Sequence, residues 1–120
     1  MARQPLRPPF PYVNIRIRLQ GMADEIETQA LIDTGFEGDL ALPRLRLPPD
    51  MPRSIRRSFR VGDGRVIYLA SYPGTVEFVD VARTVPIAIS IGTPEILIGR
   101  GVLNHFRVTF DHGREVMVEP

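Results

Sequence analysis

Apolar and polar residues alternate along the first regular segment of the chain, residues 12–20. Its apolar positions are Val13, Ile15, Ile17 and Leu19, and the positions between them are polar or charged. A period of two places successive side chains on opposite faces of a β-strand. The segment therefore predicts a strand with one buried and one solvated face.

The next segment, residues 25–32, returns after the turn-like sequence Gly21-Met22-Ala23-Asp24 and ends in the apolar run Ala30-Leu31-Ile32. A run without polar alternation is typical of a strand that is buried on both faces. We therefore expect a second strand whose end lies in the interior.

Short apolar segments and turn residues continue to the end of the chain. We predict strands at 40–42, 58–61, 66–70, 75–81, 84–89, 95–98, 107–110 and 115–118, and a short helix at 101–106. Gly62-Asp63-Gly64 and Asp111-His112-Gly113 predict hairpin turns, because Asp-Gly accepts positive φ. Short strands at regular spacing favour an all-β barrel or sandwich, and the absence of long helical patterns argues against α/β nucleotide folds.

Length and proline content set the domain organisation. The 120 residues suit one domain. Residues 1–11 carry four prolines and predict an extended N-terminal arm, which leaves residues 12–120 as a single domain. Residues 43–53 also carry four prolines and predict a loop with at most one helical turn.

Composition excludes several function classes. The chain has no Cys, so disulfides, thiolate catalysis and iron–sulfur clusters are excluded. The formal net charge of +1 gives no general reason to expect a polyanion partner. No apolar run has the length of a signal peptide or of a membrane helix, so we expect a cytoplasmic protein without a membrane partner.

Two short motifs carry the candidate chemistry. Asp33-Thr34-Gly35 follows the buried end of the second predicted strand, and Ile96-Leu97-Ile98-Gly99-Arg100 leads into the predicted helix. An isolated Asp-Thr-Gly also fits an Asx turn at the end of a strand. The second apolar segment, which comes later in the chain and ends in glycine, favours a catalytic interpretation over that turn.

This pair of motifs resembles the retropepsin-like aspartic proteases, the single-lobed relatives of pepsin. The likeness rests on residues 30–35 and 96–103 and spans about residues 12–106. It implies a closed β-barrel-like acid-protease lobe with one short C-terminal helix and a terminal hairpin. It also implies a homodimeric aspartic endopeptidase that cleaves a peptide or protein substrate with no metal and no organic cofactor.

The resemblance makes Asp33 the catalytic residue. Hydrolysis of an amide by carboxyl groups needs one ionised group as base and one protonated group as acid. Two carboxyls about 3 Å apart share one proton, because both cannot ionise at that distance. Since one chain supplies one such Asp, a two-fold axis must bring Asp33 of a second copy to the same site.

Four further residues support this loop in the implied arrangement. Thr34 would donate its hydroxyl to the opposite loop of the dimer, and Gly35 would let the backbone approach the carboxylate. Arg100 would tie the glycine segment to the loop after Asp33, with Glu37 as its partner within the chain. The alternative for Arg100 is a solvated surface side chain.

Residues 58–70 lie where such proteases place the flap, a hairpin that closes over substrate. Val61, Gly62, Asp63 and Gly64 would then form its substrate-binding tip, and the alternative is an ordinary hairpin turn. Phe36 departs from the small residue that is usual after Asp-Thr-Gly. Its ring would either narrow a subsite or fill the gap under the loop.

Other functions remain open from the sequence. The same dimeric fold could bind a peptide or protein without cutting it. A third possibility, nucleic-acid binding, is less expected. The local basic run Arg53, Arg56, Arg57 and Arg60 fits a solvated face better, or a preference for acidic residues in a protein substrate. His105 and His112 lack the neighbours of a metal site.

Overall fold

The computed structural model describes residues 8–44, 54–60 and 62–120. Nine strands and one short helix lie in these ranges: β1 (Tyr12–Leu19), β2 (Ile26–Ile32), β3 (Leu40–Leu42), β4 (Ile55–Arg60), β5 (Val66–Phe78), β6 (Thr84–Ile91), β7 (Leu97–Ile98), α1 (Arg100–Leu103), β8 (Arg107–Asp111) and β9 (Glu115–Glu119). The predicted all-β class is confirmed for this part of the chain.

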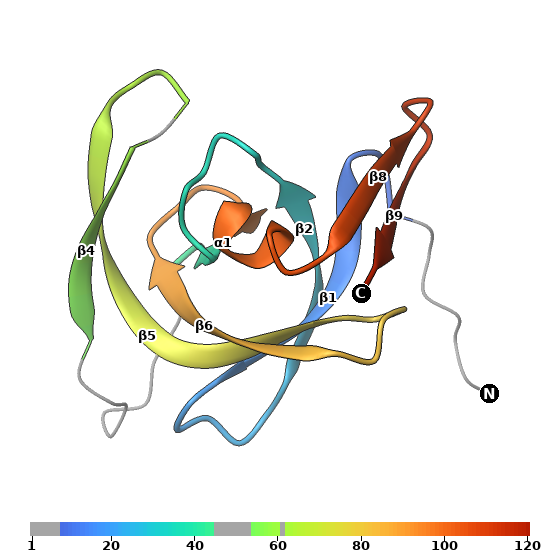
Figure 1. Cartoon of the computed structure of the whole chain (residues 1–120). Helices are drawn as coiled ribbons and strands as arrows, with labels where there is room; N and C mark the ends of the chain where they lie inside the picture. Colours follow the sequence, from blue (N-terminus) through green and yellow to red (C-terminus); the bar gives the residue numbers. More distant parts are fainter. Residues whose placement is uncertain (1–7, 45–53, 61) are drawn as a thin grey trace.

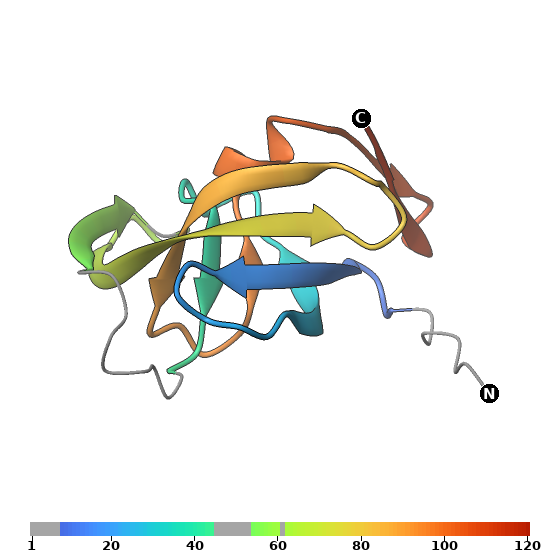
Figure 2. The same cartoon turned by 90° about the horizontal axis from the view of Figure 1, so that it is seen from below.

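Six of the strands close into a barrel. They follow the order β1-β2-β7-β3-β6-β5, and β5 pairs with β1 to complete the circle (Figure 1). The β2–β7 and β3–β6 pairs are parallel, and the other pairs around the barrel are antiparallel. Figure 2 shows the barrel from below, with β1, β5 and β6 side by side. The predicted barrel is therefore confirmed.

Apolar side chains fill the barrel interior. The four apolar positions of β1 are buried, as the alternation predicts. Leu40, Ile89 and Ile98 are fully buried and come from three further strands. Val102 of α1 joins the same cluster. Packing of these side chains is the main stabilising term of a fold without disulfides.

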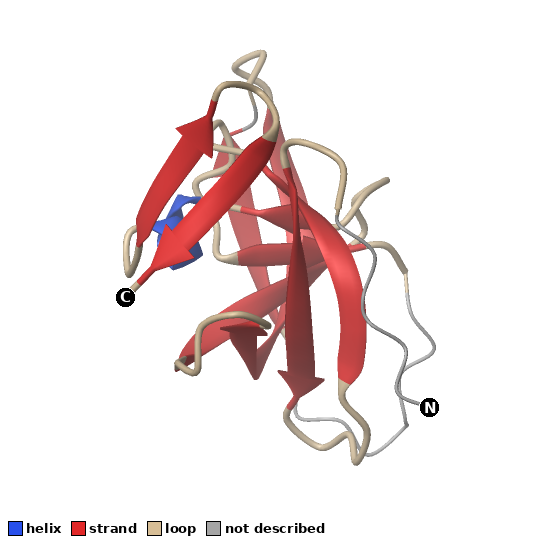
Figure 3. Ribbon diagram, turned by 90° about the vertical axis from the view of Figure 1, so that its right-hand side faces the viewer, coloured by secondary structure: helices blue, strands red, loops and turns tan. Residues whose placement is uncertain are grey.

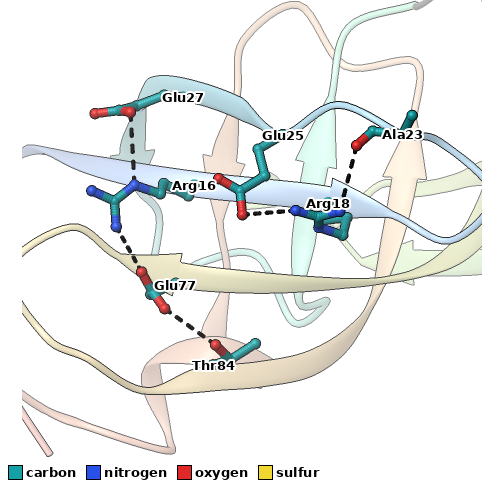
Figure 4. Close-up of polar contacts among 7 residues, drawn as sticks. All are labelled: Arg16, Arg18, Ala23, Glu25, Glu27, Glu77 and Thr84. Carbon is teal, nitrogen blue, oxygen red and sulfur yellow. Dashed lines mark hydrogen bonds and ion pairs between the residues drawn. The ribbon is translucent and has the colours of Figure 1, made fainter.

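Charged residues occupy the outer face of β1. The Nη1 atom of Arg16 lies 2.7 Å from Glu77 Oε1 on β5, and its Nε atom lies 3.7 Å from Glu27 Oε2 on β2. Arg18 pairs with Glu25 in the same way, at 3.0 Å (Figure 4). These pairs are exposed or only partly buried, so each contributes little to the free energy of unfolding.

Strand β5 is longer than predicted. The sequence Ser-Tyr-Pro-Gly at 71–74 has turn composition, which wrongly separated strands at 66–70 and 75–81. In the structure this stretch pairs with residues 87–90 of β6 and stays extended. A Cβ atom on Gly74 would lie 2.5 Å from the Arg18 carbonyl oxygen, so the glycine permits close crossing of β1 and β5.

Two hairpins extend from the barrel on opposite sides of the molecule (Figure 1), and Figure 3 views the molecule from the side of β8 and β9. In the first hairpin, β4 pairs with the first half of β5. In the second, β8 pairs with β9 as a separate two-stranded sheet. The hairpin predicted at 107–118 is confirmed. The helix is shorter than predicted, since α1 ends at Leu103 and a turn follows it.

Several predicted segments lie wholly or partly outside the described residues. They are most of the 43–53 loop, residues 1–7 of the arm, and Val61 at the hairpin tip. The described end of the arm is not fully extended, because the Tyr12 N–H donates to the Pro9 carbonyl at 2.7 Å. No helix in the described ranges is long and apolar enough to cross a membrane.

Candidate active site

The two sequence motifs lie side by side. Strand β2 ends at Ile32, and β7 runs parallel to it with Ile32 opposite Ile98. The backbone N–H of Asp33 donates to the carbonyl oxygen of Ile98 at 2.9 Å. The loop at residues 33–39, here called the Asp33 loop, therefore begins directly beside the glycine segment at 99–101.

A tight turn fixes the Asp33 carboxylate. The Gly35 N–H donates to Oδ1 of Asp33 at 2.9 Å, and the Phe36 N–H donates to the Asp33 carbonyl at 3.1 Å. The Asp33 side chain is half-buried, whereas Thr34 is exposed. Within the described residues, Oδ2 of Asp33 forms no hydrogen bond and is available to a substrate, a water or a second carboxyl.

The glycine segment holds the far part of the Asp33 loop through its backbone. Gly99, Arg100 and Gly101 donate N–H groups to the carbonyls of residues 39, 36 and 38, at 2.9–3.0 Å. A Cβ atom on Gly99 would collide with the Gly38 carbonyl oxygen and lie 2.6 Å from the Phe36 ring. Glycine is needed there because the two backbones touch.

The predicted pairing of Arg100 with Glu37 is wrong for the described chain. Oε1 of Glu37 accepts a hydrogen bond from the Arg60 N–H of β4 at 2.8 Å. Arg100 contacts the Asp33 loop through its backbone N–H, and its side chain is exposed. Glu37 therefore joins the loop to the β4–β5 hairpin instead of to the glycine segment.

Asp39 is a structural residue that sequence reasoning missed. Its Oδ2 accepts a hydrogen bond from the Ala88 N–H at 2.9 Å, which ties the end of the Asp33 loop to β6. The one available signal was a charged residue directly before the apolar run of residues 40–42. That signal does not identify a partner on a distant strand.

Phe36 fills the space between the Asp33 loop and the hairpin. Its ring is 2% exposed, and its centroid lies 5.2 Å from that of Phe59 on β4. Ala41 and Leu69 complete this second hydrophobic cluster. The sequence left open whether the ring narrows a subsite or fills the gap under the loop. Most of the ring fills that gap, and part of it also lines the cavity described below.

The β4–β5 hairpin brings its turn to the Asp33 loop. A Cβ atom on Gly35 would lie 3.7 Å from Gly62 Cα. At the turn, the Arg65 N–H donates to Asp63 Oδ1 at 3.0 Å and lowers the pKa of that carboxyl, and the Arg65 guanidinium pairs with Oδ2 at 2.6 Å. Gly64 has φ of +87°, as the hairpin prediction requires.

A cavity of about 380 Å³ lies between the Asp33 loop and this hairpin. Its apolar walls include Phe36, Ile67, Leu69, Pro94 and Leu97. Asp33 and Arg65 are its charged lining residues in the described chain. Apolar walls with a few polar groups are the usual composition of a small-molecule or peptide subsite.

Comparison of the sequence with models of known protein families gives no match, and comparison with curated proteins gives none either. Among the residues placed by the structure, no three His, Asp or Glu side chains gather as a candidate metal site. Geometry and chemistry at Asp33 are therefore the basis for a function.

Proposed function

We propose that this chain is one subunit of a homodimeric aspartic endopeptidase. The observation that carries the proposal is the setting of Asp33. Its carboxylate is fixed on one oxygen by the Gly35 N–H and lines an apolar cavity beside a hairpin turn. The resemblance of its two motifs to retropepsin-like proteases supports the same function.

The dimer follows from the number of carboxyls. Acid–base cleavage of an amide needs a base and an acid at the same bond. Asp33 is the one carboxylate among the described residues that line the cavity. A second copy related by a two-fold axis supplies the other, and Thr34, which is exposed next to Asp33, would contact the partner's loop.

The proposed reaction needs no group beyond these carboxyls and water. The ionised Asp33 accepts a proton from water while the water oxygen bonds to the scissile carbonyl carbon. The protonated Asp33 of the partner subunit donates to the carbonyl oxygen. Collapse of the resulting diol breaks the C–N bond, as one carboxyl protonates the leaving nitrogen and the other accepts a hydroxyl proton.

The cavity walls indicate the substrate class. Ile67, Leu69 and Leu97 offer an apolar surface next to Asp33. An apolar side chain beside the scissile bond would bury there, and one methylene more or less changes discrimination by about 1–3 kcal/mol. We therefore propose a polypeptide substrate with an apolar residue at the cleaved bond.

Cleavage of a mixed peptide library tests the proposal. We expect the wild-type chain to cut peptides next to apolar residues and the Asp33→Asn variant to leave them intact. Asp24→Asn is the matched control, because Asp24 is an exposed turn residue outside the cavity. Equal cleavage by wild type and Asp33→Asn would overturn the assignment. Peptides bound intact by the wild type would favour the non-catalytic binding module.

A further inference from the structure

The ribbon formed by β4 and the first half of β5 has two different faces. Phe59 lies opposite Ile67 in the β4–β5 register, on the face that packs against Phe36 and lines the Asp33 cavity. Ser58 lies opposite Tyr68 on the other face, because side chains alternate along a strand. This second side is here called the outer face.

The outer face carries an open groove of about 400 Å³. Arg44 and Arg56 supply its charge, and Tyr68, Tyr72 and Ile91 supply apolar surface. Tyr68 is 61% exposed, and the Arg56 guanidinium lies 5.8 Å from the centroid of its ring. In such a pair, the guanidinium can bind the carboxylate of an acidic side chain, and the aromatic ring can pack against its aliphatic stem.

Among the residues that the structure describes, the arginines of the outer groove have no carboxylate partner. In the described ranges, neither Arg44 nor Arg56 forms an ion pair, and no carboxylate lines the groove. Arg16 and Arg18, on the barrel, each pair with glutamates (Figure 4). The outer face therefore matches a partner that brings its own negative charge.

Strand β4 also offers an open backbone edge. It is the last strand in the sheet order of the described chain. The Arg60 N–H points away from β5 and donates to the Glu37 carboxylate. Since alternate residues of an antiparallel strand face the same edge, Arg56 and Ser58 present backbone groups on that side too. An extended peptide can add to such an edge and place alternate side chains beside the arginines.

From these features we infer that the outer face binds an extended acidic segment of a polypeptide. The inference rests on the proposed function, because it takes the acidic segment to be part of a protein substrate. The acidic segment docks on the outer face of the ribbon, and the scissile bond lies at Asp33 on the other face. The substrate class is then a protein with an acidic stretch apart from its apolar cleavage site.

Binding can be measured separately from cleavage. The ligand is a short fluorescein-labelled peptide with Glu at alternate positions, and its control carries Gln at the same positions. With Asp33→Asn protein, which removes the proposed cleavage, fluorescence anisotropy should show tighter binding of the Glu peptide. The double variant Arg44→Gln/Arg56→Gln should weaken that binding by about threefold to tenfold, the range for two exposed charge pairs.

A matched control removes the same charge elsewhere. Arg107 and Arg114 are exposed residues of the β8–β9 hairpin, and Arg107→Gln/Arg114→Gln should leave Glu-peptide binding unchanged. Equal affinity for the Glu and Gln peptides would overturn the inference, and so would equal weakening by both double variants. Tighter binding of a single-stranded oligonucleotide, lost in Arg44→Gln/Arg56→Gln, would assign the face to nucleic acid and also overturn it.

Kinetics connect the outer face to the proposed activity. For a substrate with an acidic stretch, Arg44→Gln/Arg56→Gln should raise KM about threefold to tenfold and leave kcat unchanged. For the Gln analogue, KM should not change. An acidic preference in binding without any cleavage by wild type would refute the protease and leave the docking face standing. Cleavage without an acidic preference would refute the docking face alone.

Discussion

The two ends of the Asp33 loop each carry an aspartate, and their surroundings differ. At the start, Asp33 accepts one hydrogen bond, from Gly35 two residues away, and lines a cavity. At the end, Asp39 accepts from Ala88 on β6 and packs against Gly101. Asp33 therefore faces a cavity that a substrate could enter, whereas Asp39 holds the loop on the barrel.

This difference separates catalysis from architecture within a single loop. A carboxylate used by backbone donors of a distant strand contributes to stability and is not free to exchange protons with a substrate. A carboxylate held only by its own turn can remain accessible. Substitution at the two ends should therefore affect different measurements.

The largest effect is expected for Asp33→Asn. An amide cannot act as the base, so the rate of peptide cleavage should fall at least about a hundredfold. The free energy of unfolding should stay within about 0.5 kcal/mol of wild type, because Asn retains an acceptor for the Gly35 N–H. If Asp33→Asn keeps its activity, or if it unfolds, Asp33 does not have the catalytic role that distinguishes it from Asp39.

Phe36→Ala should lower the free energy of unfolding by about 3–5 kcal/mol, because it empties the space between the loop and Phe59. Phe36→Leu is the milder control and should lose less. Denaturant unfolding measures both. A cost below about 1 kcal/mol for the alanine variant would show that the ring does not support the Asp33 loop.

Asp39→Ala should cost about 1–3 kcal/mol, since it leaves the part-buried Ala88 N–H without an acceptor. Asp39→Asn is the matched variant and should lose less, because its amide oxygen can still accept. Per folded chain, cleavage activity should remain close to wild type in both. Loss of activity in folded Asp39→Asn protein would place Asp39 in the chemistry and contradict the comparison.

The smallest effect concerns Asp63 at the hairpin turn. The Arg65 N–H and guanidinium lower the pKa of the Asp63 carboxyl below its ordinary value of 3.8. Because the pKa of Asp63 is lower in the folded than in the unfolded chain, its carboxylate contributes to the free energy of unfolding above the ordinary pKa. This contribution is lost as the pH falls through the folded-state pKa. An NMR titration of the carboxyl carbon should give a lower midpoint in the folded protein than in unfolded chains, and equal midpoints would refute the turn contact.

Patterns with a local cause could be predicted from the sequence. Alternation along β1 reports burial directly, and the apolar run of residues 30–32 marks the buried end of β2. The turn at Gly64 could be predicted because the dipeptide Asp63-Gly64 accepts the positive φ that the turn needs. The contact between the Asp33 loop and Gly99 came from the resemblance of two motifs, not from any local rule.

Features set by distant partners could not be predicted. Tyr72-Pro73-Gly74 has the composition of a turn, yet pairing with β6 and the close crossing at Arg18 keep it extended. Glu37 could reach either Arg100 or β4, and only the position of the hairpin decides that it accepts from Arg60. Asp39 bonds to a residue 49 positions away, a distance at which sequence pattern carries no information.

The central claim is that two copies of Asp33 share one active site, and mixing subunits tests it directly. Wild-type chain is held at constant concentration and equilibrated with increasing Asp33→Asn chain before cleavage is measured. A shared site predicts that activity per wild-type chain falls in proportion to the wild-type fraction, because mixed dimers hold one carboxyl. Activity that stays constant as the variant is added would contradict the shared site.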